Sequence, residues 1–175
     1  MRYLILLIIL ATGTSLEAQN FRGIDKSPLD MVNYPSSSRV QDKMVRVLYS
    51  RPQLKGRDLS TLAPKDKVWR TGANESTEIT FFKAATIAGK TVPAGRYTLY
   101  TIPGDNTWTV VLNKALNTWG AYSYDEKQDL MRVEVPVKKG DESLEALSMT
   151  IDGEGSSAKL HLGWGTLRVS VPMTF

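Results

Sequence analysis

The chain has 175 residues, a formal net charge of +4 and 23% charged residues, which is the balance of an ordinary globular protein of one domain. It contains no cysteine, and this excludes a disulfide scaffold, a thiolate metal site and a cysteine nucleophile. It contains one histidine, His161, and this excludes any site built from two histidines.

Residues 1–18 have the pattern of a secretory signal peptide. Arg2 precedes an apolar run of nine residues that ends at Ala11, and small and polar residues follow as far as Ala18. The run is too short to cross a membrane, which takes about 20 residues. We therefore expect an exported protein, periplasmic, cell-surface or secreted, that does not span the membrane once the signal is removed. The alternatives are a buried N-terminal helix and an uncleaved anchor.

Residues 19–40 are rich in serine and proline and predict an extended lead-in, with at most a short strand at residues 30–33. From residue 41 onward, apolar and polar residues alternate, as they do in half-buried strands. The alternation predicts strands over residues 45–50, 79–82, 85–87, 91–92, 96–102, 107–113, 131–137, 147–151 and 167–175.

Turn-forming residues separate these strands at residues 88–90, 103–106, 139–141 and 152–155. Pro136 and Pro172 lack the backbone donor of a central strand, so we expect sheet edges or bulges at both. Helix is expected only as one or two turns at residues 59–62 and 114–119. The predicted fold is a single all-β domain over residues 41–175: an antiparallel β-sandwich, with a jelly-roll-like or barrel-like variant left open.

Charge is unevenly distributed along the chain. Residues 43–70 carry eight basic and two acidic side chains, whereas residues 141–155 carry five acidic and no basic ones. A basic face could attract an anionic ligand, but two solvated segments that balance each other explain the pattern as well, and we favour that interpretation. Nucleic acid is not expected as a partner, because the basic residues form no helical stripe.

A loop before the strand at residues 79–82 is the first candidate binding segment. Trp69 can stack on a sugar-like ligand while Arg70 and Asn74 bond its polar edge, and Glu75 and Glu78 can act as an acid–base pair. The structural alternative is that the polar groups tie the loop together and Trp69 fills the core.

The second candidate segment, residues 116–125, places three aromatic residues in one loop. Trp119, Tyr122 and Tyr124 can form a binding platform with Asp125 beside them, or they can cover the open end of the sandwich. A third candidate, Tyr49-Ser50-Arg51-Pro52, follows a predicted strand.

No cofactor or metal is expected. His161 has no second histidine to complete a transition-metal site, and there is no phosphate-binding glycine loop or dinucleotide motif.

Five segments together resemble one bacterial family. They occur in this order: residues 25–31, Tyr49-Ser50-Arg51-Pro52, Val68-Trp69-Arg70-Thr71-Gly72-Ala73-Asn74-Glu75, residues 92–99 and Asn117-Thr118-Trp119-Gly120-Ala121-Tyr122. The chain resembles domain-of-unknown-function family 2911, exported proteins of Gram-negative bacteria, from about Asp25 to Phe175. The resemblance implies export and one intact domain, but no activity, cofactor or catalytic residue.

Three functional hypotheses follow. The first is a binding module for a small polar, anionic or glycan ligand in the cell envelope, and it requires the two loops to meet in one cleft. The second is a hydrolase that uses Glu75 with Glu78 or Asp125 as paired carboxylates. The third is an envelope interaction or scaffold protein that uses a sheet edge or an aromatic patch. Ligand identity and oligomeric state do not follow from the sequence.

Overall fold

The computed structural model describes residues 19–175, so the predicted signal peptide lies outside the described residues. The chain forms mostly antiparallel strand with little helix, which confirms the all-β, sandwich-like prediction. The strands are β1 (Leu29–Tyr34), β2 (Val45–Ser50), β3 (Glu78–Phe81), β4 (Ala85–Ile87), β5 (Lys90–Val92), β6 (Gly95–Ile102), β7 (Thr107–Asn113), β8 (Asp129–Glu154) and β9 (Ser157–Thr174).

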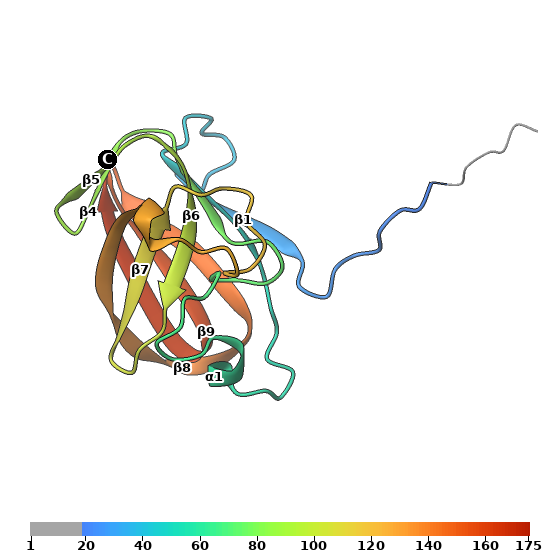
Figure 1. The fold of residues 1–175 in the computed structure, drawn as a ribbon. Helices are drawn as coiled ribbons and strands as arrows, with labels where there is room; N and C mark the ends of the chain where they lie inside the picture. The colour runs from blue at the N-terminus through green and yellow to red at the C-terminus, as the bar shows by residue number, and fades with distance from the viewer. Residues whose placement is uncertain (1–18) are drawn as a thin grey trace, which may run out of the picture.

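These strands form one sheet that does not close, in the order β1-β2-β3-β6-β7-β8-β9-β4-β5. The sheet folds over, so that β8 and β9 form a layer behind β6 and β7 (Figure 1). Strand β1 lies in the segment expected as an extended lead-in, and it pairs along its whole length with β2.

Strand β9 bends back on itself at Gly165, which has a φ of +52°. His161 Nδ1 and Ser170 Oγ lie 2.8 Å apart, whereas nine residues of straight strand would span about 30 Å. The backbone N–H of Phe175 likewise donates to the Ser156 carbonyl at 2.9 Å. The two halves of β9 therefore lie side by side in the rear layer.

Two local predictions need correction. The predicted turn at residues 139–141 is no break: β8 continues through it, and only its register with β9 shifts, between Lys139 and Leu144. The predicted helical turn at residues 114–119 is absent, and a 3-10 turn, η1 (Glu126–Gln128), follows later in that connection. The short helix α1 (Leu59–Leu62) forms where expected.

The core lies between the two layers and is filled by alternate residues of the strands. Its centre holds three tryptophans: the Trp69 ring stacks on Trp164 with 5.6 Å between ring centroids and meets the edge of Trp108 at 6.1 Å. Trp69 is only 4% exposed. Of the two interpretations of Trp69, the structure supports the one in which its side chain fills the core, because the buried ring is not open to a ligand.

Arg51 and Tyr49 connect the front layer to β8. The Arg51 guanidinium donates to Asp30 Oδ2 on β1, to the Leu147 carbonyl and to Ser148 Oγ on β8, at 2.8–3.1 Å. The Tyr49 hydroxyl accepts from the Met149 N–H at 2.9 Å, and burial raises the pKa of this phenol. These bonds hold the end of β2 in place, and that strand end forms the floor of the site described next.

Candidate functional site

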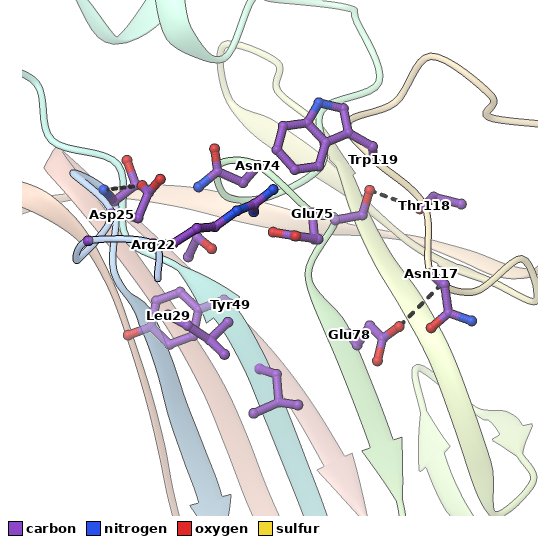
Figure 2. A pocket seen from close by; sticks show the side chains of 15 residues that line it. Arg22, Asp25, Leu29, Tyr49, Asn74, Glu75, Glu78, Asn117, Thr118 and Trp119 are labelled. Atoms are coloured by element: carbon purple, nitrogen blue, oxygen red, sulfur yellow. Dashed lines mark hydrogen bonds between the residues drawn. The ribbon is translucent and has the colours of Figure 1, made fainter. Parts of the chain in front are cut away.

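A pocket of about 500 Å³ opens at the end of β2 (Figure 2). Four parts of the chain surround it: the lead-in, β1–β2, the loop before β3 and the loop after β7. The lining residues are Arg22, Gly23, Asp25, Ser27, Leu29, Leu48, Tyr49, Ser50, Asn74, Glu75, Ser76, Glu78, Asn117, Thr118 and Trp119.

Backbone pairing brings the two candidate loops together in this pocket. The Ser76 N–H donates to the Thr118 carbonyl at 3.0 Å, and the Gly120 N–H donates to the Asn74 carbonyl at 3.1 Å. Glu75 and Trp119 face each other in an isolated antiparallel bridge. The carboxylate of one loop and the indole of the other are therefore neighbours, although 44 positions separate them in the sequence.

Buried and partly buried hydroxyls hold this junction in place. Ser76 Oγ donates to the Gly120 carbonyl, and Thr118 Oγ1 donates to Ser76 Oγ at 3.0 Å. The Tyr100 hydroxyl lies 2.9 Å from Thr118 Oγ1, which ties the loops to β6. Because buried polar groups are costly to leave unpaired, this chain of bonds favours one arrangement of the loops.

Three residues of the loops adopt the left-handed backbone conformation: Thr71, Asn74 and Asn117, with φ between +55° and +60°. Asparagine tolerates this conformation, but a β-branched threonine rarely adopts it. Thr71 is fully buried, its Oγ1 bonds to Thr101 Oγ1 at 3.1 Å, and its carbonyl accepts from Thr77 Oγ1 at 2.9 Å. These bonds offset the strain and set the path of the chain into the pocket wall.

Glu78 is held by its neighbours. Its carboxylate lies 3.6 Å from the Arg96 guanidinium on β6 and accepts from the Asn117 N–H at 3.4 Å, and its side chain is 18% exposed. These contacts give Glu78 a structural role between β3, β6 and the second loop.

The lead-in supplies the outer wall of the pocket. The Ser27 N–H donates to Asp25 Oδ1 at 2.7 Å, and this bond, with the Asn74 amide, holds the pKa of Asp25 below its usual value. The Arg22 side chain extends across the pocket toward Asn74 and Glu75 (Figure 2).

Four of the nine residues predicted as ligand-binding line this pocket: Asn74, Glu75, Glu78 and Trp119. The Trp119 side chain is 57% exposed. The other five, Trp69, Arg70, Tyr122, Tyr124 and Asp125, do not line it. Tyr122 is 87% exposed on the outer surface of the same loop as Trp119.

Tyr124 and Asp125 belong to a separate polar cluster at the start of β8. The Tyr124 hydroxyl donates to Asp129 Oδ2 at 2.6 Å, and Arg132 donates to both Tyr124 and Asp129. Burial and the bond to Asp129 raise the pKa of Tyr124 to about 12. Asp125 accepts from the Lys127 N–H and caps η1. Both residues therefore stabilise the loop rather than the pocket.

Sequence reasoning did not select Arg22, Asp25, Ser76, Asn117 or Thr118, which also line the pocket. Asp25, Asn117 and Thr118 do stand within the segments that carry the family resemblance, and Asn117 and Thr118 also lie in the second candidate segment. Tyr49 and Ser50, from the third candidate segment, form part of the floor.

His161 lies on the outer face of β9, away from this pocket. Its Nδ1 is bonded to Ser170 Oγ at 2.8 Å and its Nε2 to Asp152 Oδ1 at 3.0 Å. These are the residue types of a Ser–His–Asp triad, but the two ring nitrogens are exchanged, because in a triad Nε2 faces the serine and Nδ1 bonds the carboxylate. Asp152 is also 71% exposed. Within residues 19–175 there is also no group of three potential metal ligands, and no helix there is long and apolar enough to span a membrane.

The fold and the site define an all-β protein with an open pocket of mixed polar and apolar lining, where two loops meet at the end of its sheet. The chain belongs to the family described as Protein of unknown function (DUF2911), whose model matches residues 27–173, and this confirms the resemblance seen in the sequence. No match was found among curated proteins or among solved structures.

Proposed function

We propose that this protein is exported and binds a small polar ligand of sugar type in the pocket between its two loops. The observation that carries the proposal is the exposed Trp119 ring beside a cavity of about 500 Å³ lined by carboxylates, amides and hydroxyls. Sugar rings offer apolar faces to an aromatic ring and hydroxyls to surrounding polar groups, and such mixed lining is typical of small-molecule sites.

The other two hypotheses receive less support. For the hydrolase, Glu78 is already paired with Arg96 and bonded to Asn117, and Asp125 lies outside the pocket. For the interaction protein, the edge strand β1 exposes two large apolar side chains, Leu29 and Met31, which is a small area for a protein interface. The lining carboxylates also make an anionic ligand a poor fit.

Binding can be tested by calorimetric titration of the full chain with glucose, galactose and maltose. We expect at least one of them to bind, and Trp119→Ala to weaken its binding about tenfold, since a lost stacking contact costs about 1.4 kcal/mol. Tyr122→Ala is the matched control: it removes a more exposed aromatic ring from the same loop, outside the pocket, and should leave the affinity unchanged. Equal loss in both variants, or no binding of any sugar, contradicts the proposal.

A further inference from the structure

The charge of the pocket differs from that of the chain as a whole. The chain carries a formal net charge of +4, yet the pocket is lined by the carboxylates of Asp25, Glu75 and Glu78 against the single cation Arg22. We propose that the ligand is an amino sugar, whose ammonium group pairs with Glu75 while its ring stacks on Trp119. This inference rests on the proposed function and names the ligand class of the same site.

Glu75 is the carboxylate with free capacity to bind a cation. Glu78 is paired with Arg96, and Asp25 accepts from Ser27. In contrast, none of the ion pairs found within residues 19–175 involves Glu75, and none of the side-chain hydrogen bonds of that region ends on its carboxylate. An acceptor without a partner at the pocket wall favours a ligand that brings a donor with a positive charge.

Trp119 stands where it can add to this attraction. Its backbone pairs with that of Glu75, so the indole and the carboxylate border the same part of the cavity. A cation over an indole ring is attracted by the negative face of the ring, and tryptophan is the best partner for this contact. The neutral part of the ligand then lies on the exposed remainder of the ring.

The chain already places one cation at this position. The Arg22 side chain extends from the lead-in toward Asn74 and Glu75 (Figure 2), although no hydrogen bond joins them. A ligand ammonium group beside Glu75 would be repelled by this nearby guanidinium. Removal of Arg22 should therefore strengthen binding of a cationic ligand rather than weaken it.

The effect of the ligand's charge can be separated from that of its ring shape by comparing three sugars with the same type of ring. Glucosamine carries an ammonium group, whereas glucose and N-acetylglucosamine are neutral. Titration of the full chain, in a mildly acidic buffer of low salt that keeps the amine protonated, should give about tenfold tighter binding of glucosamine than of the two neutral sugars. One exposed ion pair and one exposed cation–π contact together predict a preference of this size. The preference should fall as salt is added, because ions screen exposed charges.

Substitutions of single residues test which side chains cause the preference for glucosamine over the neutral sugars. Glu75→Gln should weaken glucosamine binding about tenfold and glucose binding much less, so that the advantage of glucosamine is lost, and Arg22→Ala should tighten glucosamine binding several-fold. Glu134→Gln is the matched control, since it removes an exposed carboxylate outside the pocket and should change neither value.

The outcomes distinguish this inference from the proposed function. Equal affinity for all three sugars, or a preference that survives Glu75→Gln, overturns the amino-sugar inference and leaves sugar binding in place. If none of the sugars binds, both the inference and the proposed function are wrong.

Discussion

At the scale of single residues, Tyr124 shows how a side chain chosen as a ligand contact can serve the loop instead. Its ring meets the edge of Tyr100 at 5.1 Å between centroids, and its hydroxyl donates to Asp129. The same phenol accepts from Arg132, whose pKa these partners raise. Each polar group of the cluster is satisfied inside the protein, so none of them is left to hold a ligand.

The raised pKa of Tyr124 predicts how stability depends on pH. Burial and the bond to Asp129 move this pKa from 10 to about 12, so the folded state holds the phenol proton more tightly than the unfolded state. The resulting stabilisation is fully present below pH 10 and is lost as the pH rises toward 12. Tyr124→Phe should therefore destabilise the protein at about pH 8 and by clearly less at about pH 11, as measured by urea unfolding.

Tyr122→Phe is the control for this experiment, because that ring is 87% exposed. A penalty for Tyr124→Phe that is the same at both pH values would show that the phenol proton is not held by the fold.

At the scale of elements, the position of the pocket depends on how β2 is joined to β8. The residues after β2 pair with β8 through two backbone bonds, Leu54 N–H to the Glu145 carbonyl and Leu147 N–H to the Pro52 carbonyl, each 2.9 Å. Arg51 adds three side-chain bonds to β1 and β8 at the same place. Side chain and backbone together fix the floor of the pocket.

Arg51→Ala should lower the free energy of unfolding by about 1–3 kcal/mol, because it removes a set of charge-assisted bonds between elements and leaves a backbone carbonyl unpaired. Urea unfolding measures this value. Arg57→Ala is the matched control: Arg57 bonds only to the nearby carbonyls of Gln53 and Leu54 and should cost less than about 0.5 kcal/mol. Equal costs would mean that the connection to β8 does not depend on Arg51.

At the scale of the whole molecule, the pocket is assembled from segments that stand far apart in the sequence. The lead-in provides Arg22 and Asp25, and the loops provide residues around positions 75 and 118. The lead-in would directly follow the cleavage site of the proposed signal peptide. The N-terminal end of the exported protein would then be the segment that forms one wall of the pocket.

Expression in a Gram-negative host tests the proposed export. We expect the protein in the periplasm or the medium to begin at Gln19 or within a few residues of it, because the small Ala18 fits the cleavage position. Intact mass and N-terminal sequencing identify the first residue. A chain that keeps Met1 and remains in the cytoplasm would show that residues 1–18 are not a signal peptide.

Alternation in the sequence was enough to predict the strand class and most strand positions. Residues such as Val45, Val47 and Tyr49 face the core because every second side chain of a strand points to the same side. The correction at residues 139–141 has a physical cause. Glycine next to charged residues fits a turn, but a bulge also accommodates it, and only pairing with β9 decides between the two.

The sequence by itself determined that this chain builds antiparallel sheets, since periodicity is local and is read within a few neighbouring residues. It also placed Asn74, Glu75, Glu78 and Trp119 among the candidates, because polar and aromatic residues gather in loops between strands. Only the tertiary structure decided that Trp69 lies between Trp108 and Trp164, and that Trp119 lies beside Glu75. Such contacts depend on how the sheet folds over and on backbone bonds between distant segments, and no local pattern contains that information.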